Sequence, residues 1–319
     1  MARSKEKVDE LARDLRVMYN AHPFPSRESI PTTKSDDRYL HIYKNFLHLP
    51  VDEFRDLNFL DAGCGTGDVT WVWRRNLHPS NRVFAVDLSF NSINFARKSF
   101  PDAEQSPRFS VGSLLDVPLP DNSVDVVHCS GVLVAVPDPD RAFRELMRVL
   151  KPGGYVILVL YHKYGRLLHG MRRAVVDLLE PDDIDRRAEL GGKLFGRSMR
   201  KFVQEEHSPL ENILYDQFGL PCESRYSVGD GLRWFEEANI DYLGTWPPVE
   251  WSQLGNGLQF SEQFKTRQSS WWYKTVNKFF PETDVPPQDS PGFLTRFSME
   301  ALWMVNQQQL FSISGQKAG

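Results

Sequence analysis

Between residues 57 and 161, short apolar runs alternate with segments of helical periodicity, and this alternation constrains the fold more than any other feature. The apolar runs lie at 58–63, 82–88, 108–112, 124–130 and 154–161, and the helical patterns lie at 68–77, 89–99 and 138–149. Short apolar strands that alternate with helices are typical of a parallel sheet covered on both faces. The sequence therefore predicts an α/β fold with a doubly wound, mostly parallel sheet.

Three further regions flank this core, which we place at residues 55–161. Residues 1–54 are expected to form a helical lid, because apolar side chains recur at near-helical spacing over 6–20 before Pro23 and Pro25 end the pattern. Residues 162–237 are expected to form a helical cap insertion. Residues 238–319 are expected to supply closing strands of the core at 241–248 and 309–317, with an aromatic-rich insertion at 249–305.

The composition disfavours several classes of protein. The chain has 319 residues and a formal net charge of −4, whereas proteins that bind nucleic acid through its phosphates are usually basic. Its three scattered cysteines are too few for a disulfide framework or a zinc cluster, so no metal is expected. The N-terminus lacks the apolar run of a signal peptide, and no run approaches the roughly 20 residues of a membrane helix. We therefore expect a cytoplasmic protein with no transmembrane segment.

The turn after the first strand reads Asp61-Ala62-Gly63-Cys64-Gly65-Thr66-Gly67-Asp68. Glycines at such a turn let the backbone approach a ligand and leave amide groups facing it. Asp87 ends the next strand, where nucleotide-binding α/β folds hydrogen-bond ribose hydroxyls. Nicotinamide cofactors favour G-x-G-x-x-G, but Asp68 stands where that pattern needs its third glycine, and a carboxylate there would repel pyrophosphate. Asp61 instead suits a ligand that carries an amino group.

These residues carry a resemblance to a known family. FLDAGCGTGD followed by VFAVDLS resembles the Rossmann-like, class I S-adenosylmethionine-dependent methyltransferases, of the type 11/12 group with unassigned substrate. The similarity continues in order through SVGSLLDVPLPDNSVDVVHCSGVL, VPDPDRAFRELMRVLKPGG and YVILVLYHKYGR, and it covers about residues 55–166. The resemblance implies a Rossmann-like core, S-adenosylmethionine as the cofactor and methyl transfer as the reaction.

The resemblance also implies a role for individual residues. Gly63, Gly65 and Gly67 would line the methionine part of the cofactor, with Asp61 near its ammonium group and Cys64 as a small side chain in the turn. Asp87 would hold the ribose. The adenine would lie against Leu88, Ser113 and Leu114, with Asp116 as the nearest carboxylate. Cys129 and Ser130 would border the sulfonium.

Four residues are candidates for polar contact with the acceptor or for proton removal. Tyr161 and His162 follow the fifth strand, at the sheet edge where ligands of open α/β sheets bind. Tyr19 and His22 belong to a segment, YNAHPFP, that resembles a lid preceding this domain in relatives. A base is required only if the acceptor group is poorly ionised, because the sulfonium is an excellent leaving group.

The sequence leaves the acceptor open. The aromatic-rich cap favours a small molecule that is apolar, aromatic or lipid-like, and basic residues at 163–173 form either a solvated helix face or a site for an acidic substrate. The aromatic segment 271–280 is a cap core, a homodimer contact or a membrane contact. The alternatives to a small-molecule methyltransferase are a non-catalytic cofactor-binding partner protein and, less favoured by the charge, a nucleic-acid methyltransferase.

Overall fold

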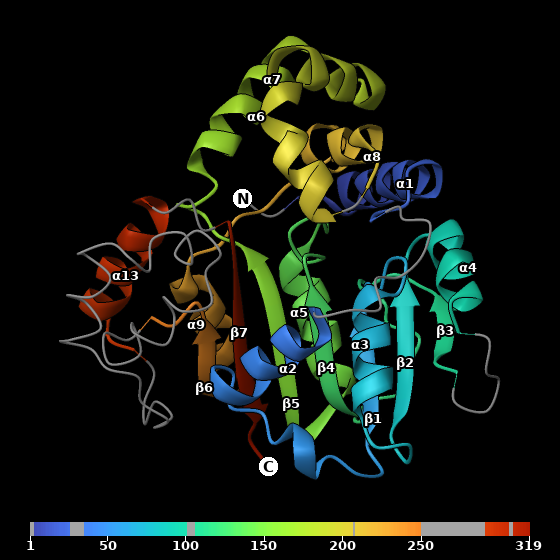
Figure 1. Ribbon diagram of the computed structural model, residues 1–319, viewed down its shortest axis with the longest axis vertical. Coiled ribbons are helices and arrows are strands. Elements are labelled where there is room, and N and C mark those ends of the chain that lie inside the picture. The colour runs from blue at the N-terminus through green and yellow to red at the C-terminus, as the bar shows by residue number, and fades with distance from the viewer. Residues whose placement is uncertain (1–2, 26–34, 101–105, 207, 250–290, 306–308) are drawn as a thin grey trace.

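The computed structural model describes residues 3–25, 35–100, 106–206, 208–249, 291–305 and 309–319. Its centre is a seven-stranded sheet in the order β3-β2-β1-β4-β5-β7-β6, with helices on both faces (Figure 1). The strands are β1 Asn58–Ala62, β2 Arg82–Asp87, β3 Arg108–Val111, β4 Val124–Ser130, β5 Leu150–Tyr161, β6 Ile240–Trp246 and β7 Leu310–Lys317. The architecture confirms the predicted α/β fold.

The sheet is parallel except for one strand. β1 pairs in parallel with β2 and β4, β2 with β3, and β4 with β5. β7 runs antiparallel between β5 and β6, with Ile157 opposite Ser314. The chain moves outward from β1 to β2 and β3 and then returns to place β4 on the other side of β1. This reversal creates a switch point between β1 and β4, where crossover connections leave in opposite directions.

Helices cover the two faces of the sheet with separate apolar cores. The helices of the first face are α2 Ser35–Asn45, α3 Asp68–Asn76 and α4 Phe90–Lys98. Trp73 of α3 packs there against Phe59 of β1 and Tyr43 of α2, in a cluster with Ile157 of β5. The second face carries α5 Pro139–Val149 and α9 Val228–Glu237, whose side chains pack on Leu60, Val127 and other neighbours of the opposite strand face.

Helix α5 shows how the sequence directs a local element. Asp138 accepts a hydrogen bond from the amide of Arg141 as the N-cap, and Pro139 occupies the first turn, where its missing N–H is not needed. Phe143 and Leu146 then recur at helical spacing and are buried against the sheet. Capping and periodicity therefore agree on the same helix.

A helical layer lies across the carboxyl ends of the parallel strands (Figure 1). It consists of α1 Lys5–Ala21, α6 Leu167–Leu179, α7 Ile184–Glu206, the short α8 Leu210–Leu214 and the π-helical turn η2 Tyr215–Gly219. A 3₁₀ turn η1 at Val51–Glu53 and a helix α13 at Phe293–Val305 complete the described elements. The apolar residues expected to face inward from the first helix, including Leu15 and Met18, are buried. The segment 271–280 lies outside the described residues.

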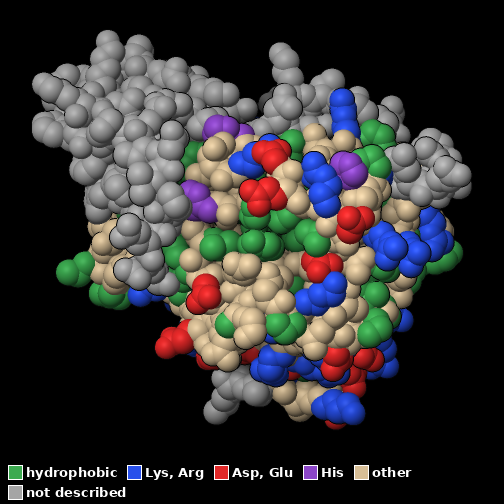
Figure 2. All heavy atoms as spheres, turned by 90° about the horizontal axis from the view of Figure 1, so that it is seen from below, with side chains coloured by type: hydrophobic (Ala, Val, Ile, Leu, Met, Phe, Trp, Pro, Cys, Tyr) green, Lys and Arg blue, Asp and Glu red, His purple; other side chains and the backbone are tan. Residues whose placement is uncertain are grey.

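The opposite edge, where the parallel strands begin, is seen in Figure 2. Basic and acidic side chains are interspersed on this face, so the two signs of charge compensate one another locally. Among the helices that the structure describes, none combines the length and the apolar character needed to cross a membrane.

Candidate functional site

A cavity of about 340 Å³ opens at the carboxyl ends of the parallel strands, beside the switch point between β1 and β4. This is where open α/β sheets bind ligands, and the volume lies within the roughly 300–1,000 Å³ of ligand pockets. The candidate residues on its wall are Asp61, Gly63, Cys64, Gly65, Asp87, Leu88, Ser113, Leu114, Ser130, Tyr161 and Tyr19. The cavity wall does not include the candidates Gly67, Asp116, Cys129, His22 and His162.

The glycine turn brings the backbone close to the cavity. Gly63 and Gly65 have φ of 80° and 51°, in the left-handed region that favours glycine. A Cβ on Gly63 would lie 2.3 Å from a methyl group of Val132, and a Cβ on Gly65 would lie 2.8 Å from the carbonyl oxygen of Phe24. The turn therefore has no room for side chains at either position. Gly67 instead precedes α3 as its N-cap, away from the cavity wall.

Asp61 is buried near the end of β1, and side chains from α3 and β4 contact its carboxylate. Its carboxylate accepts a hydrogen bond from Thr70 of α3, and its other oxygen lies 3.6 Å from Nδ1 of His128 in β4. The far nitrogen of that imidazole lies 3.1 Å from the hydroxyl of Tyr43. This chain of polar contacts fixes the orientation of a carboxylate that faces the cavity, and it gives His128 a structural role.

Asp87 ends β2 with its carboxylate on the cavity wall. One oxygen accepts from the amide of Gly65 and the other from the amide of Ser89, each at 2.8 Å. Burial raises the pKa of Asp87 to about 6, and the two amide hydrogen bonds only partly oppose this effect. Further hydrogen-bond donors, such as the hydroxyls of a ligand, would therefore stabilise the charged form.

Strand alternation explains why one of the two residues expected beside the sulfonium is absent from the cavity wall. Successive side chains of a strand point to opposite faces, so Ser130 reaches the cavity whereas Cys129 is buried in the core. Beyond β3, Ser113 and Leu114 line the cavity, but Asp116 turns back to form a bridge with Ser113 and is exposed. Burial raises the pKa of the Cys64 thiol well above its usual value, so this side chain remains a neutral thiol.

The first helix closes the cavity from above. Tyr19 lines the wall and donates a hydrogen bond to Asp216 of η2 at 3.1 Å. Burial and the charge of Asp216 raise the pKa of Tyr19 well above its usual value, so this hydroxyl stays protonated. Asn20 bonds to Ser89, at the start of α4. His22 lies outside, with its ring stacked on Tyr215 at 3.5 Å.

Of the pair Tyr161 and His162 at the end of β5, only Tyr161 faces the cavity. His162 points the other way, as alternation requires, and is fully buried against Trp303 and Phe311. Its Nδ1 accepts a hydrogen bond from the amide of Gly165 at 3.0 Å. The guanidinium of Arg166 lies over the ring of Tyr161, 3.8 Å from its centroid.

The cavity wall also carries polar residues that the sequence did not mark as site residues, among them Asp216 and Gln217, which belong to η2, and Gln309, which precedes β7. Arg166 was noted only as part of a basic segment. No local pattern marks these positions, although a π-helical turn is frequently found at functional sites.

The strand order, the glycine turn and the carboxylate at the end of β2 define a Rossmann-like α/β fold with a nucleotide-type site at its switch point. Residues 60–158, which include the glycine turn and Asp87, match the family model described as "Methyltransferase domain".

Three individual proteins show similarities of different extent to this chain. An uncharacterised protein of a Synechococcus strain is 25% identical across 86% of this chain and 70% of its own length. A demethylmenaquinone methyltransferase of Lactococcus lactis is 36% identical, but the match spans 34% of this chain and 44% of that enzyme. The solved structure of PKMT2 from Rickettsia typhi in complex with AdoHcy is similar with a TM-score of 0.55 at 16% identity, covering 92% of this chain and 54% of the other. That similarity shows the fold.

Proposed function

We propose that this protein is an S-adenosylmethionine-dependent methyltransferase that acts on a small molecule. The observation that carries the proposal is the convergence of the backbone at Gly63 and Gly65 and the Asp87 carboxylate on one cavity, within the residues that match the methyltransferase family model. The AdoHcy complex of the structural neighbour and the small-molecule chemistry named for the Lactococcus lactis relative support the cofactor and the class of acceptor.

The cavity offers groups that fit each part of that cofactor. The open backbone at Gly63 and Gly65 would accommodate the amino acid part, and the buried carboxylate of Asp61 would attract its ammonium group. Asp87 has the pKa and the position to accept ribose hydroxyls. Leu88 and Leu114 supply apolar contact for a purine, and Ser130 lines the same cavity.

When bound, S-adenosylmethionine supplies a methyl group on a positively charged sulfur, which is an excellent leaving group. The residues of this chain then have to hold the acceptor in line and exclude water, and such alignment can account for several kcal/mol of the barrier. Tyr19 remains protonated and acts as a hydrogen-bond donor. Asp216, which accepts a hydrogen bond from Tyr19, is one of the carboxylates on this wall and would receive the proton of an acceptor hydroxyl.

The lid and the cap are proposed to enclose the acceptor. Leu15 and Phe24 from the N-terminal region and Leu310 from the start of β7 add apolar surface to the same cavity. This lining suits a ring or a short aliphatic chain, and the polar groups at Tyr161 and Asp216 would orient it.

Transfer of a labelled methyl group tests the proposal. The protein is incubated with methyl-labelled S-adenosylmethionine and a small-molecule extract, and in parallel with RNA and DNA. We expect label in the small-molecule fraction together with an equal amount of S-adenosylhomocysteine, and neither product with the Gly63→Ala variant. Label in nucleic acid would identify the other type of methyltransferase. Tight cofactor binding without transfer to any fraction would favour a non-catalytic binding protein.

A further inference from the structure

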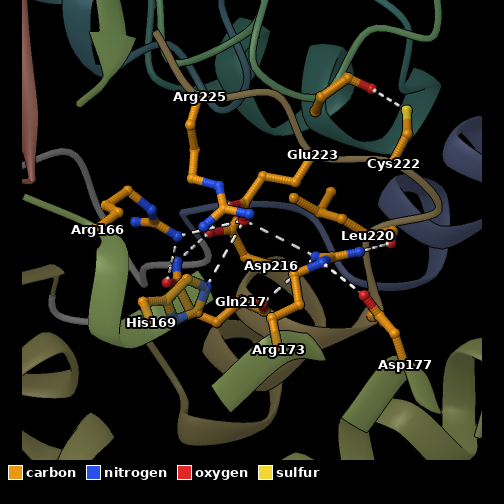
Figure 3. Close-up of polar contacts among 12 residues, drawn as sticks. Arg166, His169, Arg173, Asp177, Asp216, Gln217, Leu220, Cys222, Glu223 and Arg225 are labelled. Carbon is orange, nitrogen blue, oxygen red and sulfur yellow. Dashed lines mark hydrogen bonds and ion pairs between the residues drawn. The ribbon is translucent and has the colours of Figure 1, made fainter. Parts of the chain in front are cut away.

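The wall of the cavity formed by the cap contains a buried positive charge. Arg166, at the N-cap of α6, is 2% exposed and lines the cavity with its guanidinium over the ring of Tyr161. Figure 3 shows the polar contacts that Arg166 makes with Gln217 and Glu223. Burying a guanidinium is costly unless it is paired and hydrogen-bonded. The partners of Arg166 therefore indicate whether its charge is already compensated.

Its counterion is shared with other cations. The carboxylate of Glu223 lies 3.3 Å from Arg166, 3.8 Å from Arg173 and 3.5 Å from Arg225. Nε2 of His169 lies 3.6 Å from the same carboxylate. Burial alone would raise the pKa of Glu223, but contact with His169 and Arg166 lowers that pKa to about 2. Glu223 is therefore ionised, and its one negative charge faces three guanidinium groups. Arg173 has Asp177 as a second acidic partner at 3.4 Å, but Asp177 does not reach the cavity wall.

The remaining contacts of Arg166 are neutral. One Nη donates to the amide oxygen of Gln217 at 3.1 Å, and the other to the amide oxygen of Gln309 at 3.3 Å. These amides orient the guanidinium without neutralising it. Among the described residues, Nε of Arg166 finds no hydrogen-bond acceptor. A buried donor without a partner costs about 1–3 kcal/mol, so the described partners leave this guanidinium incompletely satisfied.

Asp216 lies on the same wall and, unlike Arg166, favours a hydrogen-bond donor on the ligand. Gln217 bridges the two groups, because its amide oxygen accepts from Arg166 while its amide nitrogen donates to Asp216 at 2.7 Å. A ligand group beside Arg166 should therefore be an anion, whereas a group beside Asp216 should be a donor, such as a hydroxyl or an amine.

We propose that Arg166 is the anchor for an anionic group of the methyl acceptor, which is thus a small acid carrying a carboxylate or a phosphate together with a hydroxyl or amino group. The inference rests on the proposed function and narrows its substrate class. Arginine suits this task because its planar fork binds carboxylate and phosphate oxygens in pairs. The basic segment identified in the sequence then divides into one binding residue, Arg166, and cap residues that do not line the cavity, such as Arg173.

The test compares matched ligands and matched variants. With the protein saturated by S-adenosylhomocysteine, 4-hydroxybenzoate, its uncharged amide and phenyl phosphate are titrated by calorimetry. We expect at least one of the two anions to bind tenfold or more tightly than the amide, and their order distinguishes a carboxylate site from a phosphate site. Equal or undetectable binding of all three by the wild-type protein would overturn the inference without any variant.

The variants locate the anion site. Arg166→Gln removes the charge from the cavity wall, whereas the control Arg173→Gln removes a charge that contacts the same Glu223 but does not line the cavity. Preference for the anion should vanish in the first and persist in the second, with unchanged affinity for S-adenosylhomocysteine. If Arg166→Gln does not fold, Arg166→Lys keeps the charge and should reduce the preference.

Failure of the acceptor site and failure of the proposed function would give different results. Loss of S-adenosylhomocysteine affinity in Arg166→Gln, with Arg173→Gln unaffected, would assign the guanidinium to the cofactor and overturn the acceptor site. Failure of the wild-type protein to bind S-adenosylhomocysteine would refute the proposed function. The anion preference, measured without that ligand, would then still report on Arg166.

Discussion

The ionisation of Asp87 leads to a quantitative prediction. In the free protein burial raises the pKa of this carboxyl to about 6, and the amides of Ser89 and Gly65 offset only part of the shift. In the proposed complex, ribose hydroxyls would donate hydrogen bonds to this carboxylate and stabilise its charged form further. Ligand binding is therefore favoured by the charged form, and affinity should fall as the pH is lowered through 6.

The size of the effect follows from the pKa. With a value of about 6, roughly 90% of Asp87 is ionised at pH 7 and roughly 10% at pH 5. If only the ionised form binds the ribose, the affinity for S-adenosylhomocysteine should weaken about tenfold over this interval, which corresponds to about 1.4 kcal/mol. Above pH 7 the affinity should level off.

Calorimetric titration with S-adenosylhomocysteine between pH 5 and pH 8 measures this dependence, since the ligand's own carboxyl and amino groups do not titrate in that range. Asp87→Asn should bind weakly at every pH, with no slope near pH 6. The matched control is Asp121→Asn, a change at an exposed carboxylate that bonds to Arg148, and it should keep the wild-type profile. A flat wild-type profile, or a slope that survives in Asp87→Asn, would refute the reasoning.

Three further predictions concern the turn, the cap and the core. Gly63→Ala should reduce S-adenosylhomocysteine affinity at least tenfold, because its Cβ would overlap Val132. The control Gly153→Ala, at a similar positive φ with open space around it, should bind this ligand with wild-type affinity. Equal affinity of the two variants would contradict the geometry. Glu223→Gln should lower the free energy of unfolding at pH 7 by about 3–5 kcal/mol, because it leaves three buried or partly buried guanidinium groups without their shared carboxylate. Since the pKa of Glu223 is lowered to about 2, its contribution to stability is complete above the ordinary carboxyl pKa and disappears as the pH falls towards 2. Urea unfolding of the wild-type protein and of Glu223→Gln at pH 7 and pH 3 measures this contribution and its dependence on pH. A difference in unfolding free energy below 1 kcal/mol at pH 7 would show that the carboxylate is dispensable. Leu146→Ala should cost about 2–5 kcal/mol of unfolding free energy by opening a cavity under α5, with ligand affinity preserved, and a smaller cost would mean that the core collapses around the gap.

The parallel core could be predicted from the sequence because its signals are local. Apolar runs, helical periodicity and the N-cap at Asp138 each act within a few residues, and they agree with one another. The glycine turn was equally readable, since positive φ at Gly63 and Gly65 depends on the residues themselves. The outcome is the predicted doubly wound, mostly parallel sheet, with a cavity at the expected edge of that sheet.

The remainder of the site depends on tertiary packing. Tyr161 and His162 are neighbours in sequence, but strand geometry sends one side chain to the cavity and the other into the core beside Trp303. Asp216 reaches the cavity because α7 and α8 carry η2 across the sheet edge, a long-range arrangement without a local signature. Most of the residues predicted to bind the cofactor therefore line the cavity, whereas of the residues predicted to contact the acceptor only Tyr19 and Tyr161 do.

The most direct test of the central claim is calorimetric titration of the purified protein with S-adenosylmethionine, S-adenosylhomocysteine and NADH. The account predicts micromolar binding of both sulfur nucleosides, loss of that binding in Asp87→Ala, and no binding of NADH. Absence of binding by both nucleosides, or binding of NADH alone, would contradict it.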